Sequence, residues 1–165
     1  MSNRGNTITI ATADGPFSFT VAGGAVIASW WGDGCGLATG EPEPDAGSQD
    51  AIIKQTSEAV TAYYAGDFGK VMAVPVQLDG TEFQNACWQA LRGVEAGDTV
   101  SYGELAHMVG RPQAARAVGS AMAHNPVPLF VPCHRVVRAD GSVGEFGFGT
   151  PLKEALLARE RSMSH

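Results

Sequence analysis

Residues 131–138 read VPCHRVVR and place a cysteine directly beside a histidine, after a proline. A free thiol is mostly protonated at neutral pH, so Cys133 needs a nearby base or a positive environment to act as a nucleophile. His134 is the nearest base, and a carboxylate on its second ring nitrogen would complete a proton relay. The helical stretch KEALLARE offers Glu154 and Glu160 for that role, and spacing alone does not choose between them.

The run LFVPCHRVV, residues 129–137, is apolar and favours an extended strand. Successive side chains of a strand point to opposite faces, so His134 is poorly placed to take a proton from Cys133 by direct contact. We therefore expect a bridging water or a local turn between the two. The same adjacency disfavours a cysteine hydrolase, in which the histidine meets the thiol directly.

The cysteines give no sign of a disulfide framework or a metal site. Cys35, Cys87 and Cys133 are odd in number and widely spaced, so we expect reduced thiols and neither a metal nor a cofactor. No run approaches the roughly 18 apolar residues of a membrane helix, and the N-terminus lacks the layout of a signal peptide. With 165 residues, 44% of them hydrophobic, the chain is expected to be a soluble cytoplasmic protein of one or two domains.

Two halves differ in pattern. In residues 1–80, apolar and small or polar side chains alternate over the first thirty positions, which predicts a small antiparallel sheet. An acidic, Gly- and Pro-rich loop is expected over 36–50, a helix over 52–69 that ends at Gly66, and a last short strand and linker over 71–80.

The second half, residues 81–165, is mainly helical in pattern. Thr81 can cap a helix over 81–94, and Ser101 can cap another, with Glu104 as its capping-box partner. A third helix is expected over 112–125, with a proline near its first position. The last two form a helix-turn-helix pattern.

The third predicted helix is rich in small residues. Ala114, Ala115 and Gly119 would let it approach another backbone closely, and Arg116 is the long charged side chain among them. The net charge of −6 argues against non-specific nucleic-acid binding by the whole chain. Residues 1–80 carry three basic and nine acidic residues, whereas the second half carries eight of each. A modest DNA-binding face is therefore possible in the second half.

Several segments, in order and spacing, resemble the O6-alkylguanine-DNA alkyltransferase family, also called methylated-DNA-protein-cysteine methyltransferases. They are GTEFQNACWQAL, SYGELAHMVG, PQAARAVGSAMAHNPVPLFVPCHRVV, DGSVGEFGFG and KEALLARE, about half of the chain. PCHRV preceded by RAVG and NP is the most specific part. The resemblance implies an α+β fold, with a ribonuclease H-like N-terminal domain over 1–80 and a winged-helix-like, helical DNA-binding and active-site domain over 81–165.

The resemblance also implies a function. Cys133 would accept an alkyl group, methyl above all, from O6 of guanine or O4 of thymine in double-stranded DNA and keep it, so that each molecule reacts once. The nucleotide would be flipped out through the minor groove, which demands close approach of the small-residue helix. A monomer, with possible clustering on DNA, is expected, and the product should be less stable because a packed site tolerates added methylenes poorly.

The family's roles fall on particular residues here. His134 would be the base, acting through water, Glu160 would orient it, and Asn125 would be a hinge between the recognition helix and the active-site segment. Arg116 would fill the space left by the flipped nucleotide. Tyr102 would help to rotate the phosphate and bond the base edge.

The substrate pocket is expected from the carbonyls of Cys133 and Val136 and from the loop 144–149. Phe146 would be an apolar wall, and the amide of Gly147 could bond O6. The family commonly has a Gly-Gly pair after this aromatic residue, whereas the chain reads FGFG. Phe148 is therefore expected to narrow the pocket mouth and to disfavour bulky adducts such as benzyl more than methyl.

Two other functions fit parts of the pattern. Related alkyltransferase-like proteins recognise alkylated DNA without chemistry, but they lack the acceptor cysteine, so Cys133 argues against this alternative. A transcriptional regulator could use the helix-turn-helix, but the chain shows no sensor domain or zinc cluster to support it.

Overall fold

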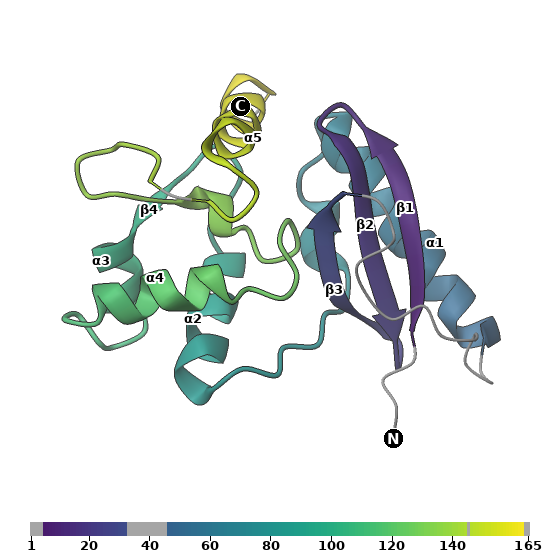
Figure 1. Cartoon of the computed structure of the whole chain (residues 1–165), viewed down its shortest axis with the longest axis horizontal. Coiled ribbons are helices and arrows are strands. Elements are labelled where there is room, and N and C mark those ends of the chain that lie inside the picture. The colour runs from purple at the N-terminus through teal and green to yellow at the C-terminus, as the bar shows by residue number, and fades with distance from the viewer. Residues whose placement is uncertain (1–4, 33–45, 145, 164–165) are drawn as a thin grey trace. The chain divides into compact units, whose positions relative to one another are not determined.

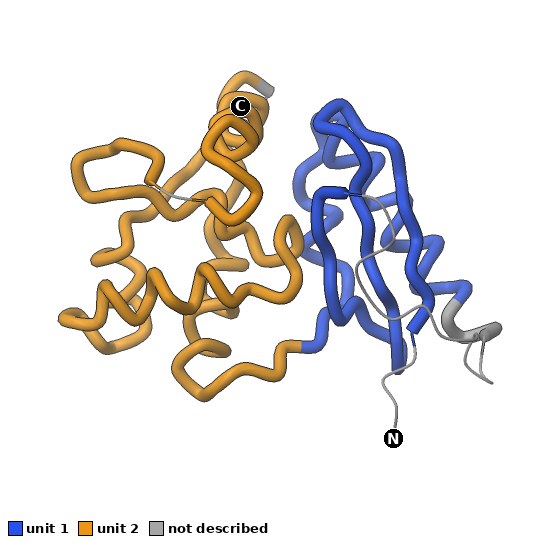
Figure 2. Tube along the Cα trace, viewed as in Figure 1, with its two compact units in different colours: residues 1–77 blue, residues 78–165 orange. Residues whose placement is uncertain are grey.

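The computed structural model describes residues 5–32, 46–144 and 146–163 (Figure 1). The chain divides into two compact units, Met1–Gln77 and Leu78–His165 (Figure 2). Among the described residues, no helix is both long enough and apolar enough to cross a membrane.

The first unit is a three-stranded antiparallel sheet with one long helix packed on it (Figure 1). Strands β1 (Asn6–Thr12), β2 (Gly15–Ala22) and β3 (Ala25–Trp31) lie in that order, and the helix α1 spans Ala46–Tyr64. Gly23 and Gly24 both have positive φ, as a two-residue hairpin turn requires. The predicted sheet and helix are thus confirmed.

Two boundaries in this unit differ from the sequence prediction. Instead of a strand after Lys70, a short 3-10 helix, η1 (Lys70–Ala73), precedes a single bridge between Val26 and Val76. Pro75 carries no backbone N–H for a ladder, which limits the pairing. The predicted loop over 36–50 lies mostly outside the described residues, as does Cys35, and its last five residues belong to α1.

The second unit is mainly helical. It contains α2 (Glu82–Arg92), α3 (Tyr102–Met108), α4 (Ala115–Ala123) and α5 (Thr150–Met163), and the two-residue strands β4 (Val100–Ser101) and β5 (Val136–Val137) pair in parallel. Both predicted caps are confirmed, because Thr81 and Ser101 each form a complete capping box, with Gln84 and Glu104 respectively.

The helix-turn-helix is formed by α3 and α4, but α4 begins three residues later than predicted. Pro112 occupies the second position of a turn that the Ala114 amide closes on the Arg111 carbonyl at 2.9 Å, a position that suits the fixed φ of proline. Trp88 of α2 packs against α4, and its buried indole N–H donates to the Ala121 carbonyl at 2.9 Å. The predicted α+β fold, a small antiparallel sheet followed by a helical part, is confirmed.

Candidate active site

Cys133 lies in a short 3-10 helix and not in the predicted strand. This helix, η2, spans Cys133–Arg135, and the Cys133 amide donates to the Val131 carbonyl at 2.8 Å. Leu129, four residues before, has a left-handed backbone with φ of 78°, a conformation that is costly for a branched side chain. The chain therefore turns tightly before the cysteine. Of the bridging water and the local turn expected from the sequence, the local turn is observed.

Asn125 stabilises this turn from the end of α4. Its side-chain amide donates to the Val131 carbonyl at 2.9 Å, and its side-chain oxygen accepts from the Val127 amide at 2.9 Å. Both hydrogen-bonding ends of one side chain are thus satisfied by the segment that leads to Cys133. These two hydrogen bonds join the end of α4 to the segment before Cys133, and the hinge role expected for Asn125 stays a prediction.

The carboxylate of Glu160 accepts hydrogen bonds from the two residues that follow Cys133 in η2. Glu160 Oε2 accepts from His134 Nε2 at 2.6 Å, and Arg135 donates to the same carboxylate through Nε at 2.8 Å and Nη2 at 3.1 Å. All three residues are buried, whereas Glu154 is exposed. The structure therefore selects Glu160 as the partner of His134.

These contacts determine which nitrogen of His134 can act as a base. Burial alone would raise the pKa of Glu160, but the hydrogen bonds of His134 and Arg135 and the nearby positive charge outweigh it and lower that pKa to about 2. The ionised carboxylate can only accept, so Nε2 carries the ring hydrogen and Nδ1 keeps its lone pair. Nδ1 is buried and has no hydrogen-bond partner among the described residues. Burial also lowers the pKa of His134, so the ring is neutral and able to take a proton.

The thiol of Cys133 is buried, and its surroundings have opposing effects on its pKa. Burial raises its pKa, while the Asn125 side chain and the charge of Lys153 lower it. Lys153 lies in the first turn of α5 and is only 1% exposed. Burial lowers the pKa of Lys153, and the charge of Cys133 raises it. A buried cation near the thiol therefore favours the thiolate.

Sequence reasoning did not identify Lys153, although a signal was present. Positions 153, 156, 157 and 160 have the spacing of one helix face. Leu156 and Leu157 on that face are apolar, and both are buried in the structure together with Lys153 and Glu160. Two charged residues on an otherwise apolar face indicate buried charges.

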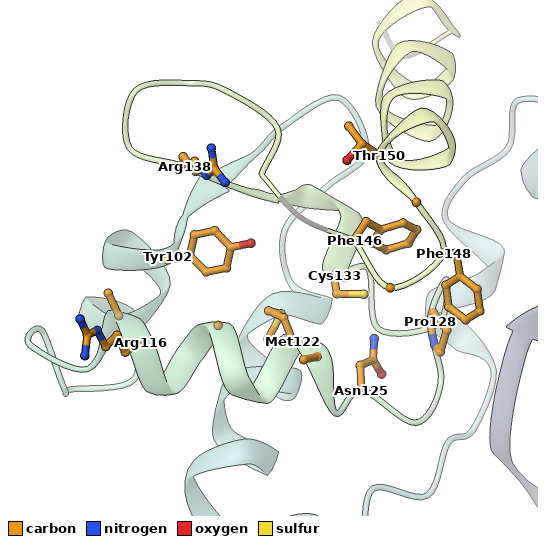
Figure 3. Close-up of a pocket in the computed structure, with 15 residues that line it drawn as sticks. Tyr102, Arg116, Met122, Asn125, Pro128, Cys133, Arg138, Phe146, Phe148 and Thr150 are labelled. Carbon is orange, nitrogen blue, oxygen red and sulfur yellow. The ribbon is translucent and has the colours of Figure 1, made fainter.

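A cavity of about 970 Å³ opens beside Cys133 (Figure 3). Among the predicted site residues, the structure places these in its lining: Tyr102, Ala115, Arg116, Gly119, Asn125, Cys133, Phe146, Gly147 and Phe148. Six further residues also line it, and of these only Gly149 belongs to the predicted loop: Met122, Ala123, Pro128, Arg138, Gly149 and Thr150. His134 and Glu160 are not in the lining, which is consistent with a role behind the cysteine.

Two further predicted residues lie outside the lining. Val136 is fully buried and paired with Val100 in the two-stranded sheet, and it is not among the lining residues. The expectation that its carbonyl contributes to the pocket stays a prediction. Ala114 is the residue that precedes α4 at its N-terminus.

Tyr102 lies where α4 and the loop after β5 come close together. A Cβ at Gly119 would lie 3.9 Å from the Tyr102 ring, and a Cβ at Gly144, whose φ is 74°, would lie 3.4 Å from its hydroxyl oxygen. Both small residues therefore leave room for this ring. Arg116 is exposed at the N-terminal end of α4, on the same side of the cavity as Tyr102 (Figure 3).

The chain matches known DNA-repair proteins. Residues 82–162 match the family model described as 6-O-methylguanine DNA methyltransferase, DNA binding domain. The chain is 44% identical to the methylated-DNA-protein-cysteine methyltransferase of Mycobacterium bovis over 119 residues. This aligned segment covers 72% of this chain and 69% of that protein. The chain belongs to the methylated-DNA-protein-cysteine methyltransferase family. The predicted resemblance is thereby confirmed.

Other members of the methyltransferase family support the same assignment. The Mycobacterium leprae protein is 47% identical over 113 residues, 68% of each chain. Among solved structures, Mycobacterium tuberculosis OGT in complex with DNA has a TM-score of 0.79 at 33% identity and covers 95% of this chain and 93% of that one. The O6-methylguanine DNA methyltransferase of Methanococcus jannaschii has a TM-score of 0.64 at 25% identity, with 93% of each chain covered.

Replacing Glu160 by glutamine should remove one component of the acid sensitivity of the fold. The folded pKa of about 2 lies below the ordinary value of 4.5, so ionised Glu160 stabilises the fold above pH 4.5 and this contribution is lost as the pH falls through 2. We expect the free energy of unfolding of the parent, but not of Glu160→Gln, to lose about 3 kcal/mol from this group over that range. Urea unfolding at several pH values measures the difference.

The exposed Glu154→Gln serves as the matched control and should keep the acid response of the parent. An identical loss of stability on acidification in the parent and in Glu160→Gln would contradict the assignment of the low pKa to Glu160.

Replacing Lys153 by methionine should make the thiol less reactive at neutral pH. Without this cation the pKa of Cys133 rises further, so the thiolate fraction at pH 7 falls. We expect iodoacetamide to modify Cys133 several-fold more slowly at pH 7, with the difference closing as the pH rises past the pKa in both proteins. Peptide mass mapping distinguishes Cys133 from Cys35 and Cys87, and Lys70→Met is the control for loss of an exposed charge. Unchanged pH profiles would show that Lys153 does not act on the thiol.

Proposed function

We propose that the chain repairs alkylated DNA by transferring an alkyl group, methyl above all, from O6 of guanine to the sulfur of Cys133. The observation that carries this proposal is a buried thiol that lines a cavity of about 970 Å³ and is followed in the chain by a neutral histidine with a fixed tautomer. The names of the relatives, methylated-DNA-protein-cysteine methyltransferases, support the reaction. O4 of thymine offers the same chemistry and is proposed as a second substrate.

The reaction is a direct displacement. The thiol proton passes to Nδ1 of His134, through a water molecule, and the sulfur attacks the alkyl carbon. The new S–C bond forms as the C–O6 bond breaks, and the electron pair of that bond goes to O6, where an amide such as that of Gly147 is proposed to bond it. The product is a thioether, from which the thiolate is not regenerated, so each protein molecule reacts once. The transfer needs no cofactor.

A base inside a duplex cannot reach a buried sulfur, so the damaged nucleotide must be rotated out of the stack. We propose that α4 enters the minor groove, with Ala114, Ala115 and Gly119 allowing close approach. Arg116 would fill the space left by the base, which offsets part of the cost of unstacking, and Tyr102 would contact the rotated nucleotide. The exposure of Arg116 at the edge of the cavity supports this role.

A protein that recognises alkylated DNA without chemistry is the second candidate. The buried, neutral His134 next to Cys133 favours alkyl transfer, because a recognition protein needs neither the thiol nor an oriented histidine. We place the chain in the cytoplasm, where thiols stay reduced, and propose that it acts as a monomer on double-stranded DNA.

Replacing Cys133 by alanine separates the two candidates. The variant should bind a duplex with one O6-methylguanine as tightly as the parent, since the sulfur contributes little to binding, yet remove no methyl from the DNA. Gel-shift titration measures binding, and digestion of the recovered DNA to nucleosides measures the methyl remaining. Methyl loss with the alanine variant at the rate of the parent would refute the proposed acceptor.

A further inference from the structure

The C-terminal end of α2 is connected to the chain on both sides of Cys133. Before the cysteine, the guanidinium of Arg92 donates through Nε to the Phe130 carbonyl at 3.0 Å. After the cysteine, Arg135 donates through Nη1 to the Val94 carbonyl at 2.6 Å. Arg92 and Val94 lie next but one to each other in the chain, so one short stretch holds both flanks of the nucleophile.

This short stretch is itself firmly positioned. The Gly93 amide donates to the Ala90 carbonyl at 3.1 Å. The Val94 amide donates to the Leu91 carbonyl at 2.9 Å, and Leu91 is fully buried. Through Trp88, α2 also packs against α4 (Figure 1). The same helix therefore supports α4 and the segment that carries the nucleophile.

The segment that Arg92 contacts has a costly backbone conformation. Leu129 is left-handed, with φ of 78°, and directly precedes Phe130. A bulky residue keeps such a conformation only where the surrounding structure holds it. Arg92 holds the carbonyl of Phe130, and Asn125 holds the next carbonyl along the chain, that of Val131, at 2.9 Å. Two side chains from different helices thus fix successive carbonyls directly after the strained residue.

Arg92 acts on the path of the backbone and not on the charge of the thiol. It is half-buried and is not among the residues that line the cavity. Burial lowers the pKa of its guanidinium, yet the group stays charged in proteins, and a charged donor makes a stronger hydrogen bond than a neutral one. The pKa of Cys133 is instead raised by burial and lowered by the Asn125 side chain and by Lys153.

We propose that Arg92 is a positioning residue for alkyl transfer, which holds the turn before Cys133 so that the sulfur meets the reacting carbon in line. The inference rests on the proposed function and adds to it a residue of α2 outside the cavity. Reacting atoms must lie about 3–3.5 Å apart with their orbitals aligned, and a misplacement of about 1 Å lowers a rate about a hundredfold. Loss of Arg92 should therefore slow the chemical step and leave DNA binding unchanged.

The test is single-turnover methyl transfer from a duplex with one O6-methylguanine, with the protein in excess at several concentrations. The parent, Arg92→Met and Arg92→Lys are compared, and each series gives the limiting rate and the half-saturating concentration separately. Methionine keeps an unbranched stem without the donor, whereas lysine restores a charged donor without the planar fork of arginine. Arg161→Met, at an exposed position of α5, is the control for loss of a positive charge.

We expect the limiting rate of Arg92→Met to fall about ten- to hundredfold at an unchanged half-saturating concentration. Arg92→Lys should recover part of this loss, and Arg161→Met should behave as the parent. The pH at which iodoacetamide modifies Cys133 at half its maximal rate should stay the same in all four proteins. An unchanged limiting rate, a raised half-saturating concentration or a shifted pH profile in Arg92→Met would overturn the inference.

Urea unfolding shows whether each variant is folded at the assay temperature. If Arg92→Met does not fold, Arg92→Lys carries the test alone, and a limiting rate equal to that of the parent would then overturn the inference. Absence of methyl transfer by the parent would instead contradict the proposed function, so the two failures are distinguishable.

Discussion

The ionised carboxylate of Glu160 is the constraint on which the active site depends. Burying a charge costs several kcal/mol unless partners replace the lost water, and here His134 and Arg135 supply those partners. Arg135 also donates to the Val94 carbonyl at 2.6 Å. One carboxylate thereby connects α5, η2 and the segment after α2, and the position of each depends on the others.

The same interaction determines the chemistry. A carboxylate that cannot donate leaves the ring hydrogen of His134 on Nε2 and the lone pair on Nδ1, so the base is oriented before any substrate arrives. Asn125 supplies the second connection, since its two hydrogen bonds join the end of α4 to the turn before Cys133.

The sequence predicted features that depend on neighbours in the chain. Thr81 and Ser101 begin helices because their caps act over three residues, and the three strands follow from short-range alternation. It failed where particular side-chain contacts decide the path of the backbone. The run before Cys133 looked like a strand because its composition is apolar, but Asn125 and the left-handed Leu129 bend it into a turn.

The choice of Glu160 over Glu154 likewise depends on how α5 packs, although the helical spacing of positions 153, 156, 157 and 160 carried a signal for the burial of Lys153 and Glu160. The residues that line the cavity were largely predictable, but only through the family resemblance. The direction in which the Cys133 sulfur faces required the structure.

The most direct test of this account is the mass of the protein after reaction with excess duplex that contains one O6-methylguanine, followed by peptide mapping. The account predicts a gain of one methylene per protein molecule, located on Cys133, with no further gain on longer exposure. Tight binding of the lesion without any gain in mass, or a gain on another residue, would contradict it.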